Sequence, residues 1–217
     1  MAMRKGKVSS AVIRRLPRYY RTLDALHRSG TVRISSSALG QHMGVTASQI
    51  RQDLSCFGEF GQQGYGYNVE DLRREIAEIL GMNRGCTAVL LGAGNLGRAL
   101  MRNFAFQAAG FTLCAAFDSN PDTVGRRFNG VEVLPSSALS EYLRSHIIQV
   151  GVLSVPGYAA QAAADALLAG GVRGIWNFTN TELDPGDSGV FIENVHFSDS
   201  LLTLSYYITG RGGQQAD

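Results

Sequence analysis

The stretch Cys86-Thr87-Ala88-Val89-Leu90-Leu91-Gly92-Ala93-Gly94-Asn95-Leu96-Gly97 decides the fold of the larger part of this 217-residue chain. Its first half is an apolar run, which is typical of a buried parallel strand. Its second half is a G-x-G-x-x-G sequence, and a helical pattern from Arg98 to Ala108 follows it. In such a unit the first glycine makes the turn, the second admits a pyrophosphate, and the third lets the helix pack on the strand. Free N–H groups at the start of the helix would bind the phosphates.

The segment after this motif strengthens the prediction of a dinucleotide site. A second apolar run, Phe111–Phe117, is followed by Asp118, which lies 21 positions after Gly97. A carboxylate about 20 residues beyond the glycines binds the adenosine ribose, and it favours NAD over NADP because it would repel a 2′-phosphate. The alternative is an aspartate that only caps a loop of an α/β domain.

Strands and helices continue to alternate along the rest of the chain. Apolar runs at 131–134, 147–153, 172–178 and 191–195 read as strands, and 136–144 and 158–169 read as helices. This alternation predicts an α/β fold with a Rossmann-type parallel sheet, which binds ligands at the carboxyl ends of its strands. We therefore expect the cofactor cleft to be lined by Gly92, Ala93, Gly94, Asn95, Leu96, Gly97, Asp118, Ser119, Ser154, Val155, Pro156, Asn177 and Phe178.

The last helical segment, from Ser198 to about Ile208, is apolar on several sides. One intramolecular face does not need so many apolar residues, so we expect a partner subunit to cover part of this helix.

The first 80 residues follow a different pattern, that of a winged helix. Pro17 suits the first turn of a helix that ends at Gly30. Ser35–Ser37 offers N-caps for a second helix that ends at Gly44, and Thr46 caps a third that runs to about Phe57. Two helices that flank a tight turn containing glycine form the helix-turn-helix pattern.

The third helix is the predicted recognition helix. Ala47, Ile50 and Leu54 share one face and would pack inward. Arginine, glutamine and serine are the side chains that read bases or bind phosphates. The alternative is an ordinary polar surface helix. The residues that we expect to contact DNA from this helix and its cap are Thr46, Ser48, Gln49, Arg51, Gln52 and Ser55.

The glycine-rich stretch Phe60–Tyr67, with alternating aromatic residues, predicts a short hairpin after the recognition helix. Such a hairpin is a wing, and Gln62, Gln63 and Tyr65 would face the DNA. We expect at least one of Tyr65 and Tyr67 to pack on the core instead. Asn68 then caps a helix whose apolar stripe ends near Leu80.

Charge and composition support this division. Residues 1–68 carry ten Lys and Arg against three Asp and Glu, whereas the remainder carries ten against fifteen. A basic end of this kind is typical of a nucleic-acid-binding protein, although a solvated basic face would look the same. Three cysteines without metal-ligand spacing, and no apolar run of membrane length, indicate a cytoplasmic protein without a metal site.

We predict a winged-helix domain at 1–80, a dinucleotide-binding domain at 86–197 and a C-terminal helix and tail at 198–217. A dehydrogenase needs an acid or base beside the nicotinamide. Among the histidines only His196 is placed to approach the cleft, and the only lysines are Lys5 and Lys7. A cofactor site without catalytic equipment, joined to a DNA-reading domain, indicates a sensor rather than an enzyme.

Several motifs resemble those of the redox-sensing transcriptional repressors of the Rex family. They are Arg15–Arg21, Ser48–Ser55, Phe57–Gly61, Gly64–Val69, Gly92–Gly97, Phe117-Asp118 and Asn177-Phe178. The resemblance covers nearly the whole chain. It implies a homodimer with exchanged C-terminal helices, which binds a palindromic operator when NAD⁺ predominates and releases the DNA when NADH binds. It also implies that Phe197 enters the nicotinamide pocket.

The resemblance assigns a redox switch to three positions, and two of them depart from the family. An aspartate that the family carries is His196 here, a tyrosine is Asn103, and the third member, Arg15, is retained. A family member with a weakened or lost redox response is therefore a second hypothesis. An NAD-dependent oxidoreductase, or a protein that binds another adenine-containing ligand such as coenzyme A or ATP, are further alternatives.

Overall fold

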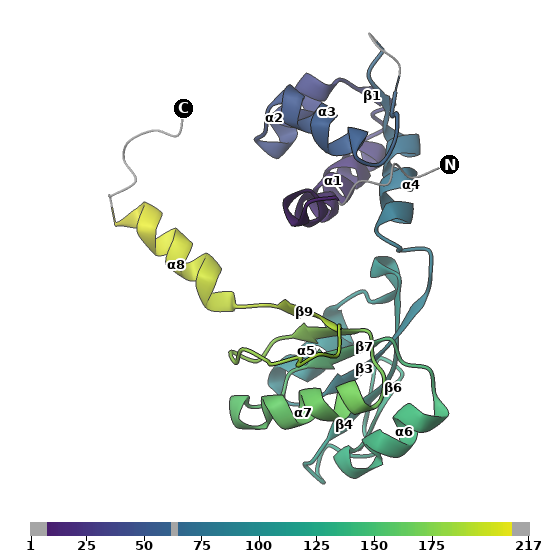
Figure 1. Ribbon diagram of the computed structural model, residues 1–217, viewed down its shortest axis with the longest axis vertical. Helices are drawn as coiled ribbons and strands as arrows, with labels where there is room; N and C mark the ends of the chain where they lie inside the picture. Colours follow the sequence, from purple (N-terminus) through teal and green to yellow (C-terminus); the bar gives the residue numbers. More distant parts are fainter. Residues whose placement is uncertain (1–7, 62–64, 210–217) are drawn as a thin grey trace. The chain divides into compact units, whose positions relative to one another are not determined.

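A computed structural model describes residues 8–61 and 65–209, and its contacts divide the chain into two compact units, Met1–Arg84 and Gly85–Asp217 (Figure 1). The first unit contains α1 (Ser10–Arg28), β1 (Arg33–Ile34), α2 (Ser36–Met43), α3 (Ala47–Ser55), β2 (Tyr67–Asn68) and α4 (Val69–Ile79). The second contains β3 (Cys86–Leu91), α5 (Asn95–Asn103), η1 (Gln107–Ala109), β4 (Phe111–Asp118), β5 (Arg127–Phe128), β6 (Val131–Pro135), η2 (Ser136–Ala138), α6 (Leu139–Ser145), β7 (Val150–Leu153), α7 (Gly157–Ala169), β8 (Gly174–Asn177), β9 (Phe191–Asn194) and α8 (Phe197–Ile208).

The first unit is a helix-turn-helix supported by two further helices. α1 packs on α4, and α2 packs on α3. Gly44 ends α2 in the left-handed conformation, and the Thr46 side chain then accepts the backbone N–H of Gln49 at the start of α3. Ser35 and Asn68 cap α2 and α4 in the same way. These caps confirm the predicted positions of the helix starts.

The prediction that Pro17 lies in the first turn of α1 is wrong. The helix begins at Ser10, seven residues earlier, because Ser9 caps it and an apolar stripe continues on both sides of the proline. That stripe is Val12, Leu16, Tyr19 and Leu23, all buried, whereas Ala25 is exposed and Tyr20 and Leu26 are only half-buried. The helical period therefore outweighed the local preference of proline for a helix start.

The predicted wing lies partly outside the described residues, since Gln62, Gln63 and Gly64 fall in the gap. β2 pairs with β1, with Tyr67 opposite Ile34 in an antiparallel register. Tyr67 is buried in the core of the first unit and Tyr65 is 69% exposed. The prediction that at least one of the two tyrosines packs inward is confirmed.

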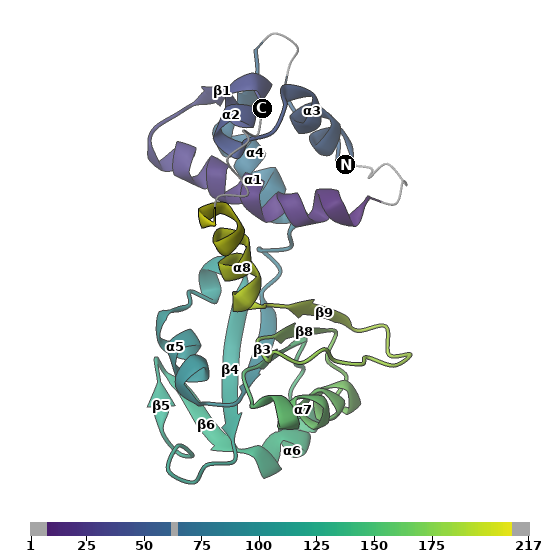
Figure 2. The same cartoon turned by 90° about the vertical axis from the view of Figure 1, so that its left-hand side faces the viewer.

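The second unit is a seven-stranded sheet in the order β5-β6-β4-β3-β7-β8-β9. All neighbours are parallel except the short β5, which is antiparallel to β6 and was not predicted (Figure 2). Without β5, the order of the strands along the chain is 3-2-1-4-5-6, which is the doubly wound dinucleotide-binding order. The predicted α/β class and Rossmann-type sheet are confirmed.

Alternating side chains of the central strand enter two cores. Val89 and Leu91 pack under α6 and α7, while Leu90 faces α5. The helices thus cover both faces of the sheet, as a continuously apolar parallel strand requires.

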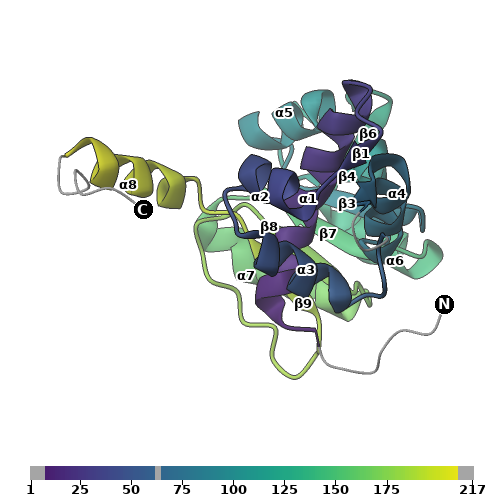
Figure 3. The same ribbon diagram turned by 90° about the horizontal axis from the view of Figure 1, so that it is seen from above.

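Several predicted boundaries shift by a few residues. α5 begins at Asn95 rather than Arg98, directly after Gly94, and ends at Asn103 rather than Ala108 because Phe104 is extended. β7 and β8 begin two or three residues later than predicted. α8 follows β9 and begins one residue earlier than predicted, and none of its residues is buried (Figure 3).

Candidate functional site

The exposed face of α3 carries four of the predicted DNA-contacting residues. Ile50 and Leu54 are buried, as expected, while Ser48, Arg51, Gln52 and Ser55 are exposed. Thr46 is also exposed at the start of the helix. This arrangement presents hydroxyl, guanidinium and amide groups on one helix face, which is the chemistry of major-groove readout.

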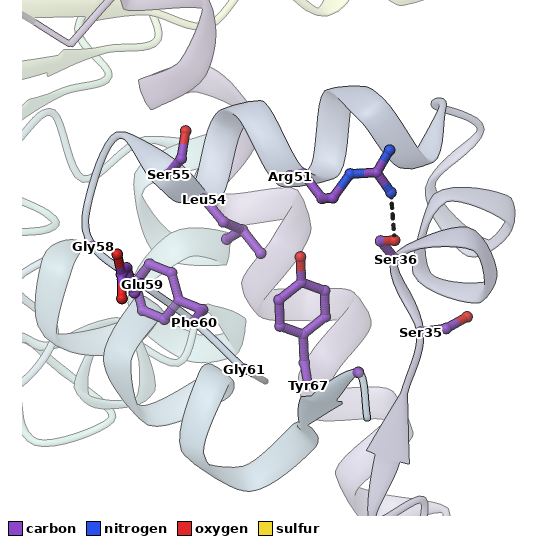
Figure 4. Close-up of a pocket in the computed structure, with 11 residues that line it drawn as sticks. Ser35, Ser36, Arg51, Leu54, Ser55, Gly58, Glu59, Phe60, Gly61 and Tyr67 are labelled. Atoms are coloured by element: carbon purple, nitrogen blue, oxygen red, sulfur yellow. Dashed lines mark hydrogen bonds between the residues drawn. The ribbon is translucent and has the colours of Figure 1, made fainter. Parts of the chain in front are cut away.

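A cleft of about 700 Å³ lies beside this face (Figure 4). Arg51 Nη1 donates to Ser36 Oγ at 3.0 Å, and the Tyr67 side chain points toward Arg51 from the opposite wall. Burial raises the pKa of Tyr67, and Arg51 opposes that shift. The cleft therefore combines the Arg51 guanidinium with hydroxyl groups from three serines and Tyr67, beside the carboxylate of Glu59. Its lining residues are Ser35, Ser36, Arg51, Leu54, Ser55, Gly58, Glu59, Phe60, Gly61, Gly66 and Tyr67.

Gln49 is less exposed than predicted. It is half-buried, and its Nε2 donates to Asp53 Oδ1 at 2.7 Å. Asp53 itself is fully buried on the inner side of α3. Asp53 is absent from the residues predicted to contact DNA. The i, i+4 spacing of Gln49 and Asp53 was the signal that could have found the pair.

Tyr65 lies next to the gap in the described residues and is exposed. The Arg33 guanidinium lies 5.9 Å from the centre of its ring. The two side chains thus form an exposed cation–π pair at the base of the predicted wing.

The second candidate site is a cleft of about 770 Å³ at the carboxyl ends of β3 and β7, where the strand order reverses. Open sheets of this kind bind their ligands at this switch point. The cleft brings together eight of the predicted cofactor residues: Gly92, Ala93, Gly94, Asp118, Ser119, Ser154, Val155 and Pro156. Its wall also contains Arg98, Asn120, Thr123, Ser136 and Tyr158, which the sequence analysis did not single out.

The three glycines of the motif fit the predicted roles in different ways. Gly92 has a positive φ of 94°, and a Cβ there would lie 2.6 Å from Ser154 O. A Cβ at Gly97 would lie 2.0 Å from Gly92 O, so this glycine permits close packing of α5. At Gly94 a Cβ would meet nothing within 4 Å. The open space beside the backbone at Gly94 fits a pyrophosphate.

Asp118 accepts two backbone N–H groups, from Ala93 at 2.6 Å and from Asn120 at 2.7 Å. These bonds fix the carboxylate between the glycine turn and the loop after β4. A carboxylate has four lone-pair positions, so Asp118 retains acceptors for ribose hydroxyls.

Six predicted cofactor residues lie outside the lining of the cleft, namely Asn95, Leu96, Gly97, Asn177, Phe178 and Phe197. Asn177 is fully buried, and its amide bonds Thr179, Thr181 and Asn194, so it holds the loop after β8. Phe178 lies between Trp176 and Phe197, with ring centres 4.5 and 6.1 Å away.

The three predicted switch residues have separate surroundings. Arg15 forms a two-point ion pair with Asp53, at 2.7 and 2.8 Å. His196 Nε2 lies 3.3 Å from Glu182 Oε1 in the second unit. Asn103 is exposed at the end of α5.

Among residues 8–61 and 65–209, no helix is long and apolar enough to cross a bilayer. The same residues contain no group of three acidic, histidine or cysteine side chains that could hold a metal ion.

Two family models match the chain. One is described as "Putative DNA-binding protein N-terminus" and matches residues 7–55, and the other is described as "CoA binding domain" and matches residues 83–181.

Curated relatives match nearly the whole length. The redox-sensing transcriptional repressor Rex of Clostridium beijerinckii is 49% identical over 207 residues, 95% of this chain and 98% of the relative. That of Thermoanaerobacter pseudethanolicus is 48% identical over 203 residues, 94% of this chain and 90% of the relative.

Solved structures also match nearly the whole length of the chain. A crystal structure of RSP with β-NAD⁺ and operator DNA has a TM-score of 0.89 at 46% identity, and covers 96% of this chain and 95% of that chain. A crystal structure of RSP with β-NADH has a TM-score of 0.88 at 43% identity. The match covers 96% of this chain and 97% of that chain. RSP is described as a Rex-family repressor.

Proposed function

Because this chain belongs to the Rex family of redox-sensing transcriptional repressors, we propose that its affinity for operator DNA depends on whether NAD⁺ or NADH is bound. The first unit binds the operator, the second binds the nucleotide, and NADH releases the DNA. One observation carries the proposal: a single chain joins an exposed polar recognition helix to a switch-point cleft with room for a pyrophosphate at Gly94.

Two crystal structures of one relative, RSP, support the assignment of both ligands. RSP has been crystallised with NAD⁺ together with operator DNA, and separately with NADH. These structures cover 96% of this chain, so both units have counterparts in a protein that binds both partners.

We also propose that the protein is not an enzyme and acts in the cytoplasm. The support is that its curated relatives are named as redox-sensing transcriptional repressors.

The proposed active form is a homodimer that binds a palindromic operator. α8 supports this proposal because Leu201, Leu204 and Tyr207 are each more than half exposed, which is unusual for apolar residues in a helix. A second copy of the chain would cover them.

A family member with an altered redox response is the second candidate. His196 pairs with Glu182 and Arg15 pairs with Asp53, so each already has a partner within its own unit. If these positions couple nucleotide binding to DNA binding in the family, that coupling differs in this chain.

The deciding experiment is an operator titration with NAD⁺ or NADH at fixed protein concentration. NADH-dependent release would support the proposal, and equal binding in both states would support the altered response. Arg51→Ala should weaken DNA binding at least about fivefold, as loss of one good base or phosphate contact does, and should leave NADH binding unchanged.

Turnover of NADH with small carbonyl substrates would instead favour an oxidoreductase. Tighter binding of coenzyme A or ATP than of NADH would favour a different adenine ligand.

A further inference from the structure

The recognition helix contains a fully buried carboxylate, that of Asp53. Arg15 Nε and Nη2 donate to its two oxygens at 2.7 and 2.8 Å. The Tyr19 hydroxyl donates at 3.1 Å, and Gln49 Nε2 donates at 2.7 Å. Four hydrogen bonds from three side chains therefore converge on one acid.

These contacts keep Asp53 ionised although it is buried. Burial alone raises the pKa of Asp53, but the hydrogen bonds from Arg15, Gln49 and Tyr19 outweigh it and hold the pKa below its usual value. An ionised carboxylate has acceptors only, so each neighbour must turn a donor toward it.

The contacts also link two helices. Arg15 and Tyr19 are one helical turn apart on α1, and Gln49 and Asp53 are one turn apart on α3. A bidentate arginine–carboxylate pair fixes both distance and orientation, so it limits rotation of α3 about its own axis. That rotation determines which side chains of α3 face the bases.

Gln49 gains a fixed amide orientation from the same carboxylate. A glutamine amide can ordinarily present either its oxygen or its nitrogen to a base. Here the nitrogen faces Asp53, and Gln49 Oε1 accepts no hydrogen bond from any residue within 8–61 or 65–209. Gln49 is the third residue of α3, in the part of a recognition helix that contacts base edges.

We propose that Asp53 is a positioning residue for base recognition: it holds α3 on α1 and directs the Gln49 amide oxygen toward an amino donor in the major groove. The donor is N6 of adenine or N4 of cytosine, because these are the amino groups exposed there. The inference rests on the proposed function, since it presumes that α3 reads DNA.

The test uses the full-length protein and a labelled duplex that the wild-type chain selects from a random-sequence pool. Copies of that duplex with each single base-pair change define where the protein discriminates. Gln49→Met should lose about tenfold discrimination or more at one A·T or C·G pair, as the loss of one base contact predicts. Asp53→Asn should lose discrimination at the same pair, while the dependence of affinity on salt stays that of the wild type because the phosphate contacts remain.

Two further variants separate positioning from folding. Asp71→Asn is the matched control, since it makes the same exchange in an exposed ion pair with Arg74 and should bind like wild type. If Asp53→Asn unfolds, the double variant R15M/D53L replaces the buried pair with apolar side chains of similar size, which is often tolerated. It should unfold as cooperatively as the wild type and still lose the same discrimination, measured without added nucleotide.

Three outcomes would overturn the inference. A folded Asp53 variant could keep wild-type discrimination at every position, or weaken binding equally to every duplex. Gln49→Met could lose discrimination at a base pair at which Asp53→Asn retains it. A wild-type chain that selects no duplex would instead refute the proposed function, and this inference with it.

Discussion

Gly94 and Gly97 stand three residues apart in one motif, yet a side chain would meet different surroundings at each. The space beside Gly94 is open, whereas a Cβ at Gly97 would collide with Gly92 O at 2.0 Å. One glycine is therefore required by the ligand and the other by the fold.

The two alanine variants should separate these roles. Gly94→Ala should lower NADH affinity about tenfold or more, because its methyl group occupies the space of the pyrophosphate, and should leave thermal unfolding unchanged. Gly97→Ala should destabilise the second unit by about 1–3 kcal/mol, as overpacking does. Calorimetry of NADH binding and of unfolding measures both, and equal effects of the two variants would contradict the division.

The buried ion pair at Asp53 predicts how stability depends on pH. The pKa of Asp53 is lowered in the folded protein, so its contribution to the free energy of unfolding is complete above the ordinary pKa of about 4. That contribution is lost as the pH falls through the folded value.

Denaturant unfolding of wild type and Asp53→Asn between about pH 6 and pH 3 isolates this contribution. The wild type should lose stability more steeply with acid than the variant. Hydrogen exchange of α1 and α3 would assign the loss to the first unit, and parallel pH profiles would show that Asp53 does not contribute.

At the scale of elements, the close approach of α2 and α3 depends on Gly40. A Cβ at this position would lie 2.5 Å from Val45 O, and Gly40 O itself accepts the N–H of Val45. Gly44 is evident from the sequence as the turn glycine, whereas the requirement at Gly40 depends on how the two helices pack.

Gly40→Ala should therefore separate the two helices and destabilise the first unit by about 1–3 kcal/mol. Operator affinity should fall with it, while NADH binding is retained. Ser37→Ala, on the exposed side of α2, is the control and should stay within about 0.5 kcal/mol of wild type. If Gly40→Ala is as stable as the wild type, the turn accommodates a methyl group.

At the scale of the whole molecule, α8 is a helix that the single chain leaves without a buried residue. Leu201 is 67% exposed and Leu204 is 53% exposed. The proposed homodimer would bury these side chains, which makes its stability sensitive to charge on α8.

The variant L201D/L204D should therefore shift the protein from dimer to monomer in analytical ultracentrifugation and weaken binding to a palindromic duplex. Ile147→Asp places one such charge at an apolar residue that is 87% exposed outside α8, and should remain dimeric. A dimer that survives the α8 variant would place the interface elsewhere.

The sequence by itself determined the features that depend on neighbouring residues. Caps at Ser35, Thr46 and Asn68, the left-handed Gly44 and the strand before Gly92 are all local, because each rests on contacts within a few residues. The family resemblance and the alternation of strands and helices likewise indicated the sheet and its cleft.

Only the tertiary structure decided what depends on contacts between distant segments. Asp53 meets Arg15 across 38 positions, and Asn177 meets Asn194 across 17, so neither partner could be assigned from spacing alone. The same reason places Asn177 outside the lining of the cleft. A polar side chain adopts the orientation that satisfies its hydrogen bonds, and those partners are known only when the chain is folded.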